Sequence, residues 1–562
     1  MKKSRLIGGL LLLCFLPFLS YAQDDQEIAP VTRTFVLKNA TIITQPGQMI
    51  ENGQILIKNG LIEAVGKSVS VPSNAKVIDV DSMYIYPGFI EGLSRTGVPR
   101  PKDEERREIK DPGNPPNDAA GIQPERSVVD LLSADDSSIE SMRKLGFTAA
   151  HVVPHGNMLP GQGAIILLGG SSPEEMVLAS NTSLFSQLEG ARRVYPATTM
   201  AVMSKWRELY QQAKQAQQHE KNYKNNPRGM TRPSYDGTLE AFYPVLDQEL
   251  PVFFTAESVK DAYRVLALQE ELGFPLVLAG LKQGFYMTDE LKAKGFPLLL
   301  SLDIPESKEE KKKEEGEEED KEKAKPDPEK EALKKRQKEA IAKHQSQAAT
   351  LSEAGLTFGF STLEVKSGDV KNNLMTMIEK GISEEKVLAS LTTIPAKMLG
   401  MSDMLGTLEK GKIANLVITD KPYFSKESNV RYVFVDGAPF EYEAKKPKKK
   451  GDASAKVSAA GEWSYTINIP GQAMSGTFKI KQDGDGQISG TITSPDDGSE
   501  GELQEVVLSG NNLSFSFPYD AGGQAMKVSF DVIIDGDEVE GTVTAGSFGT
   551  FDVEGERIGV PD

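Results

Sequence analysis

Short apolar runs separated by turn residues mark residues 34–86. Phe35-Val36-Leu37 and Ile42-Ile43 are two of these runs, and Asn59-Gly60 is one of the breaks between them. An Asn-Gly step between apolar runs is a strong β-hairpin signal. The pattern predicts a small β-sandwich over residues 34–86.

The pattern changes between residues 87 and 400, where short apolar runs alternate with helical stretches. Residues 148–153, 252–254 and 276–278 are typical of strands, and 199–220, 258–272 and 383–399 are typical of helices. Repeated βα units over about 300 residues predict an α/β fold with a TIM-like, parallel (β/α)₈ barrel over 87–400.

A charged insertion interrupts this region over residues 306–345. Within it, 25 of the 32 residues from 308 to 339 are charged, with both signs mixed. Such a stretch cannot bury a core, so we expect a solvated helix or a disordered excursion, and a docking tail is the alternative.

Three further segments follow the barrel region. Residues 401–442 return to short strands, and a lysine-rich linker covers 443–460. Alternating apolar residues and regularly spaced glycines then predict a C-terminal all-β domain over 461–562. We expect about eight antiparallel strands there, closed into a barrel or a sandwich.

Residues 1–22 have the pattern of an export signal. Positive residues precede an apolar run from Leu6 to Leu19, and Ser20-Tyr21-Ala22 forms a small-x-small cleavage site. The only cysteine, Cys14, lies inside this signal, which excludes disulfides and cysteine metal sites from the mature chain. We expect a periplasmic or secreted protein, with no membrane span in the mature chain.

The net charge of the chain limits the classes of molecule that it can bind. With 64 Lys and Arg against 81 Asp and Glu, the formal net charge is -17. A surface this acidic repels phosphate backbones, so we expect no nucleic-acid partner.

Three motifs together resemble the amidohydrolase superfamily, and specifically its periplasmic imidazolonepropionase-like members. They are Tyr86-Pro87-Gly88-Phe89-Ile90, Leu159-Pro160-Gly161-Gln162-Gly163, and the stretch from Leu391-Thr392-Thr393-Ile394-Pro395-Ala396-Lys397 to Gly411-Lys412-Ile413-Ala414. The resemblance covers roughly residues 34–440. It implies that 34–86 and 401–442 form one composite β-sandwich around a metal-dependent barrel. The implied activity is that of a hydrolase acting on non-peptide C–N bonds.

The resemblance also shows where metal ligands are missing. Relatives place a His-x-His pair where this chain has Leu93 and Arg95, and further histidines where it has Thr255 and Gly280. Their late-strand aspartate aligns with Thr362 within one position. Leucine and glycine offer no ligand side chain, and arginine stays protonated and repels a cation. We therefore expect no metal cofactor.

Other candidates leave two alternatives open. His151 and His155 could form a new site for Zn or another divalent metal, but Pro154 between them argues against the helix that would pair them. Glu91 and Asp369 are candidate acid–base residues, and Glu257 and Glu364 are further carboxylates near the predicted barrel mouth.

The leading hypothesis is an exported pseudoenzyme that has lost metal catalysis. It would bind a small-molecule ligand or act as partner subunit of a paralogous active amidohydrolase. One alternative is an active amidohydrolase with a rearranged metal or acid–base site. Another is a cell-envelope adhesion or scaffold protein that acts through its C-terminal β-domain. A separate expectation is that Arg95 binds a carboxylate or phosphate ligand.

Overall fold

A computed structural model describes residues 33–101, 109–305, 328–443, 455, 457–469, 472–482, 488–493, 500–520, 525–546 and 549–559. The predicted export signal, most of the charged insertion and most of the linker lie outside these ranges. The described end of the insertion, from residue 328, is a helix.

One sheet joins the two segments that flank the barrel region. Its eight strands run β16-β15-β14-β5-β1-β2-β3, with β4 paired to β1. The central pairing is antiparallel, with Pro87 of β5 opposite Leu416 of β14. Its strands are β1 (Thr34–Gln45), β2 (Gln48–Lys58), β3 (Leu61–Gly66), β4 (Lys76–Asp79), β5 (Tyr84–Pro87), β14 (Leu416–Thr419), β15 (Val430–Val435) and β16 (Ala438–Glu441).

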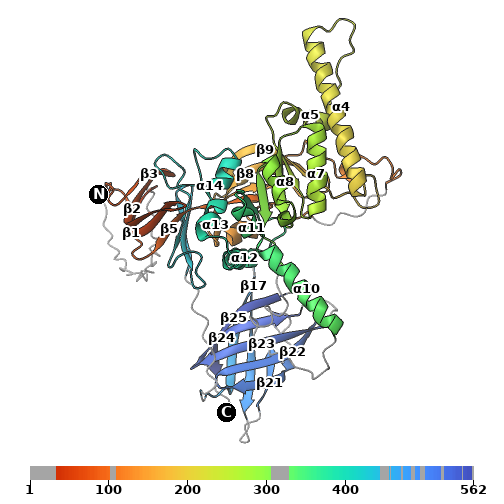
Figure 1. Cartoon of the computed structure of the whole chain (residues 1–562). Coiled ribbons are helices and arrows are strands. Elements are labelled where there is room, and N and C mark those ends of the chain that lie inside the picture. Colours follow the sequence, from red (N-terminus) through yellow and green to blue (C-terminus); the bar gives the residue numbers. More distant parts are fainter. Residues whose placement is uncertain are drawn as a thin grey trace, which may run out of the picture.

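The middle of the chain forms a closed eight-stranded barrel in the order β10-β11-β12-β13-β6-β7-β8-β9 (Figure 1). Its strands are β6 (Phe89–Ser94), β7 (Phe147–Val152), β8 (Gly161–Leu167), β9 (Val177–Gln187), β10 (Val252–Thr255), β11 (Leu276–Leu281), β12 (Leu298–Ser301) and β13 (Gly359–Ser361).

The prediction of an all-parallel barrel is wrong at one strand. β8 runs antiparallel to both β7 and β9, whereas the other pairings are parallel. Fewer than a dozen residues connect β8 to each neighbour, which is too short for the helical crossover that parallel strands need.

Helices surround the barrel, and α4 extends away from it as an arm (Figure 1). Trp206 and Tyr210 anchor the first half of α4 against Phe242 and Phe274. The helices are α1 (Asn117–Ala120), α2 (Ser137–Arg143), α3 (Pro173–Met176), α4 (Thr199–Asn225), α5 (Gly237–Glu240), α6 (Tyr243–Leu246), α7 (Val259–Leu272), α8 (Thr288–Lys294), α10 (Pro328–Gln345), α11 (Gln347–Glu353), α12 (Ser367–Glu379), α13 (Glu384–Leu391) and α14 (Thr393–Met398), with 3₁₀ turns η1 (Val128–Leu131) and η2 (Gly284–Tyr286).

The helix predicted over 383–399 is divided into α13 and α14. Thr392 leaves helical geometry there, with φ -130° and ψ -82°. The ring of Pro395 would clash with the carbonyl of Leu391 in a continuous helix, so the break falls where proline requires it.

The C-terminal domain is one antiparallel sheet of nine strands, in the order β20-β19-β18-β17-β25-β24-β23-β22-β21. Its own core contains Trp463, Phe478, Phe515 and Phe530. The strands are β17 (Gly461–Ile469), β18 (Gln472–Gln482), β19 (Ile488–Thr493), β20 (Glu500–Glu502), β21 (Gln504–Ser509), β22 (Asn512–Asp520), β23 (Ala525–Asp535), β24 (Glu538–Ala545) and β25 (Gly549–Gly559).

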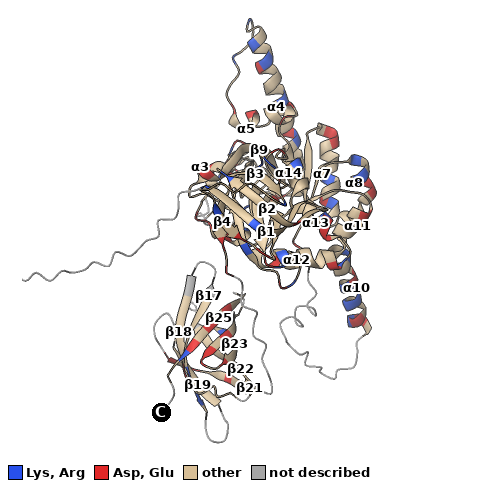
Figure 2. Cartoon of the chain, turned by 90° about the vertical axis from the view of Figure 1, so that its left-hand side faces the viewer, with Lys and Arg blue, Asp and Glu red and all other residues tan. Residues whose placement is uncertain are grey.

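Charge is unevenly distributed over the molecule. Residues 461–562 contain 18 Asp and Glu but four Lys and Arg, and Figure 2 marks acidic positions in red on the strands of this sheet. Within the described part of the chain, no helix has the length and apolarity that a bilayer crossing requires.

Candidate functional site

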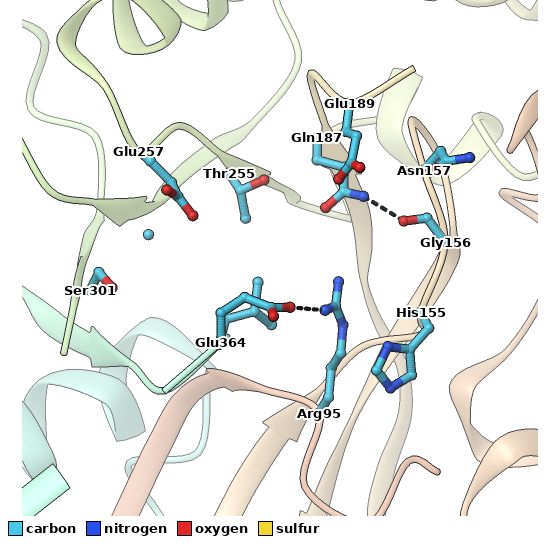
Figure 3. Close-up of a pocket in the computed structure, with 12 residues that line it drawn as sticks. Arg95, His155, Gly156, Asn157, Gln187, Glu189, Thr255, Glu257, Ser301 and Glu364 are labelled. Carbon is cyan, nitrogen blue, oxygen red and sulfur yellow. Dashed lines mark hydrogen bonds and ion pairs between the residues drawn. The ribbon is translucent and has the colours of Figure 1, made fainter. Parts of the chain in front are cut away.

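The carboxyl ends of all seven parallel barrel strands surround one cavity of about 220 Å³. This is the end at which barrel enzymes of this type carry their sites. Antiparallel β8 contributes no residue. The lining residues are Arg95, His155, Gly156, Asn157, Gln187, Glu189, Thr255, Glu257, Gly280, Ser301, Leu363 and Glu364 (Figure 3).

An ion pair lies on one side of this cavity, after the neighbouring strands β6 and β13. Arg95 follows β6 directly, and its Nη1 donates to Oε1 of Glu364 (Figure 3). Arg100 lies 3.6 Å from the other carboxylate oxygen of Glu364. The Arg95 side chain is 17% exposed. Burial lowers the pKa of Arg95, whereas the neighbouring Glu364 raises it. A paired guanidinium therefore stands at a position where the family resemblance implies a ligand histidine.

The backbone of Glu364 adopts an uncommon conformation. Its φ of 63° lies in the left-handed region, which costs a non-glycine residue about 1 kcal/mol. Strain of this kind is concentrated at functional sites. Here it accompanies the contact between the Glu364 carboxylate and Arg95.

The other position of the missing His-x-His pair lies in an apolar cluster inside the barrel. Leu93 is fully buried and belongs to this cluster. No side chain in the cluster offers a metal ligand. Its buried members are Leu93, Val153, Phe185, Phe253, Val277, Ala279 and Leu299.

His151 is buried in the barrel with both ring nitrogens in hydrogen bonds. Nδ1 lies 3.2 Å from the Gly92 carbonyl, and Nε2 lies 2.9 Å from Ser183 Oγ. A carbonyl can only accept, so Nδ1 donates and the Nε2 lone pair accepts from the serine hydroxyl. Burial lowers the pKa of His151 to about 4, which keeps the ring neutral. No lone pair remains for a metal.

The other predicted candidates lie in three different places. His155 lines the cavity, with Nε2 3.1 Å from the Val98 carbonyl. Asp369, in the first turn of α12, is exposed and does not line the cavity. Glu91 is buried and does not line it either.

Glu91 forms a pair with Thr362. Thr362 Oγ1 donates to Oε1 of Glu91 at 2.5 Å, and Oε2 has no hydrogen-bond partner among the described residues. Burial raises the pKa of Glu91 to about 7, although hydrogen bonds from hydroxyl groups oppose the shift.

Thr255 and Gly280 both line the cavity, at the ends of β10 and β11. Gly280 has φ 71°, and the nearest atom to an added Cβ would be 3.9 Å away. Space is therefore available at Gly280, but a histidine there would need a left-handed backbone.

These observations test whether a divalent metal fits the mouth. The described residues contain no cluster of three or more His, Cys, Asp or Glu that could hold one. The region contains instead a half-buried, ion-paired arginine, an apolar cluster and a histidine without a free lone pair. The residues present do not fit the metal of the family.

Sequence reasoning missed several cavity residues. Gln187 ends β9 and Glu189 follows it, but no strand was predicted over 177–187, and Asn157 and Ser301 were also not anticipated. A strand predicted to end at Gln187 would have placed that residue at the mouth. Glu257 and Glu364 were anticipated, and both line the cavity.

Comparisons with known proteins give one family and one fold. Residues 304–439 match the model described as "Amidohydrolase family". An amidohydrolase structure from Thermotoga maritima MSB8 is similar over 73% of this chain and 100% of that chain, with 22% identity and a TM-score of 0.59. This similarity shows the fold.

Weaker similarities are found to a putative prolidase from Bifidobacterium longum and to molinate hydrolase. The first has 16% identity and a TM-score of 0.43 over 75% of this chain and 97% of that chain. The second has 13% identity and a TM-score of 0.40 over 73% of this chain and 95% of that chain. No curated protein matches the sequence.

Proposed function

Residues 304–439 belong to an amidohydrolase family domain, which contains the third of the three motifs, and from this premise we propose that the chain has lost metal catalysis and acts as a binding or partner subunit. The observation that carries this proposal is the Arg95–Glu364 ion pair at the mouth. The half-buried guanidinium of Arg95 offers no lone pair to a metal, and the Glu364 carboxylate is already engaged with two arginines, so neither residue serves as a ligand.

The apolar cluster around Leu93 supports the same proposal. Metal-assisted hydrolysis requires a cation that lowers the pKa of bound water, held by imidazole or carboxylate ligands. The cluster replaces such ligands by hydrocarbon, so water at this mouth is not activated in that way. What remains is a cavity with charged walls, which suits binding.

Metal analysis of the purified full-length mature protein tests this proposal. We expect well under one equivalent of Zn, Mn or Fe by elemental mass spectrometry, because no adequate ligand set is present. Stoichiometric metal that is lost in His151→Ala but kept in His219→Ala would contradict it. His219 is a matched control because it lies on α4 and contacts the Thr231 carbonyl.

The alternative of an active enzyme with a rearranged site requires Glu91, Asp369, His151 and His155 to act together. These side chains form no metal-binding group among the described residues. We therefore prefer the binding or partner role to the active enzyme. Copurification with a second amidohydrolase-like chain would support the partner role. Its consistent absence would leave ligand binding as the function.

We also propose that the protein is exported to the periplasm or secreted. The support is the sequence of residues 1–22. Protein recovered from the cell envelope or the medium should begin at Gln23, which mass spectrometry determines. An intact Met1 terminus would count against export.

A further inference from the structure

We propose that the mouth cavity binds a small organic cation that carries a primary ammonium or guanidinium group. This inference rests on the proposed function, because it assigns a ligand class to the cavity that metal catalysis no longer uses. The four charged side chains that line the cavity are Arg95, Glu189, Glu257 and Glu364.

The single lining cation is already neutralised. Arg95 and Arg100 share the Glu364 carboxylate, and the Nε of Arg95 is buried without a partner. Arg100 itself is 81% exposed, so solvent screens its charge. An incoming anion would have to compete with Glu364 for Arg95.

The opposite wall has an excess of negative charge. Lys282 Nζ lies 3.1 Å from Glu257 and 2.6 Å from Asp303, so one ammonium serves two carboxylates. Glu257 lines the cavity, whereas Lys282 and Asp303 do not. This wall therefore attracts a second cation, and because the Glu257 side chain is 59% exposed, the attraction is strongest at low ionic strength.

Glu189 adds a further carboxylate. It forms no ion pair with any described lysine or arginine, although the charge of Arg95 acts on it at longer range. Figure 3 places Glu189 and Glu257 on the two sides of Thr255. A cation beside Thr255 would face carboxylates from both directions.

The neutral lining groups also favour a ligand that donates hydrogen bonds. Gln187 Nε2 donates 2.5 Å to the Gly156 carbonyl, which leaves its Oε1 as an acceptor. The Thr255 hydroxyl can accept as well. His155 does not oppose a cation, because burial and the neighbouring arginines lower its pKa.

The size of the cavity limits the ligand. Sites for drug-sized molecules have volumes of about 300–1,000 Å³. At about 220 Å³, this cavity suits a monocation with a short carbon chain. Leu363 supplies an apolar contact for that chain.

Three probes of equal chain length test the inference on the full-length mature protein at low ionic strength. They are butylammonium, butyrate and butanol, with binding measured by saturation-transfer NMR and titration. We expect butylammonium to bind about tenfold tighter than either other probe, with a Kd on the order of 1 mM for so small a ligand.

Variants test which side chains bind the probe and whether the cavity prefers a positive charge. The double variant Glu189→Gln with Glu257→Gln should weaken butylammonium binding about tenfold. Glu249→Gln should leave it unchanged, because Glu249 is an exposed carboxylate near the opposite end of β10. Arg95→Gln should strengthen butylammonium binding, since it frees the charge of Glu364.

The outcomes separate this inference from the proposed function. Tighter binding of butyrate, abolished by Arg95→Gln, would replace the cation by an anion. Absence of saturable butylammonium binding would also overturn the inference, and a low metal content in the same samples would leave the loss of catalysis standing. Stoichiometric metal would overturn the proposed function whichever probe binds.

Discussion

At the scale of single residues, Glu91 is a buried carboxyl group outside the cavity, and its burial affects the stability of the fold. The residue is 1% exposed, and one carboxyl oxygen lacks a hydrogen-bond partner among the described residues. A buried carboxylate without compensating partners destabilises the fold. Burial raises the pKa of Glu91 to about 7 because ionising the group costs more free energy in the folded state than in water.

Glu91 should therefore make stability depend on pH. Because its folded pKa lies above the unfolded value, its contribution is fully present below about pH 4.5 and is lost as pH rises through 7. Glu91→Gln keeps an acceptor for Thr362 and removes the titration. We expect it to be more stable than the wild type by up to about 3 kcal/mol at pH 8, with the gain shrinking towards pH 5.

Urea denaturation of both proteins at several pH values measures this difference, and Glu249→Gln serves as the exposed control. A stability difference that does not change between pH 5 and pH 8 would show that Glu91 does not titrate in this range.

From the sequence, residues could be assigned to the site only where they lie close to a family motif. Leu93, Arg95, Thr255 and Gly280 followed from alignment to family motifs, because those positions are adjacent to recognisable strands. The partnership of Arg95 with Glu364 could not be predicted, because the two residues are 269 positions apart and a left-handed backbone at Glu364 accompanies it.

At the scale of elements, the C-terminal sheet carries like charges on facing strands. Glu540 of β24 is opposite Glu554 of β25, and Glu538 is opposite Glu556. Like charges directly opposite one another destabilise an antiparallel pair.

Glu554→Lys should relieve this repulsion. The lysine would face Glu540 on one side and Thr466 of β17 on the other. We expect the domain to gain about 0.5–1 kcal/mol at low salt, measured by thermal unfolding, with the gain diminishing at 1 M salt. A gain that persists at high salt would indicate a packing effect instead.

Strands and helices could be predicted from the sequence where the local pattern of apolar and polar residues determines them. The barrel strands β7, β10 and β11 and the helices α4 and α7 fall close to the predicted ranges. The direction of β8 and the division between α13 and α14 were missed. The first depends on connection length, and the second on the effect of Pro395 on the preceding turn.

At the scale of the whole molecule, the C-terminal domain carries 14 of the 17 net negative charges. The predicted exclusion of nucleic acid therefore applies most strongly to this domain, because repulsion between exposed charges is screened within about 10 Å. Its core is also a separate set of residues from the barrel core.

Deleting residues 455–562 should leave the barrel folded. We expect its thermal midpoint to change by less than about 3 °C, because no buried residue of the barrel core is removed. Circular dichroism measures the midpoint. Retention of the truncated chain on cells or in its complex tests the scaffold alternative, since loss of retention would assign the function to the β-domain.

The sheet that joins β5 to β14 has a consequence for biosynthesis. Tyr84–Pro87 pairs with β1 on one side, but its neighbour on the other side, Leu416–Thr419, is synthesised more than 300 residues later. Because synthesis starts at the amino terminus, this sheet cannot be completed until most of the chain has been made. For a protein exported as proposed, this delay keeps the amino-terminal part of the sheet incomplete. The chain therefore stays unfolded enough to pass through a translocation channel until most of it has been synthesised.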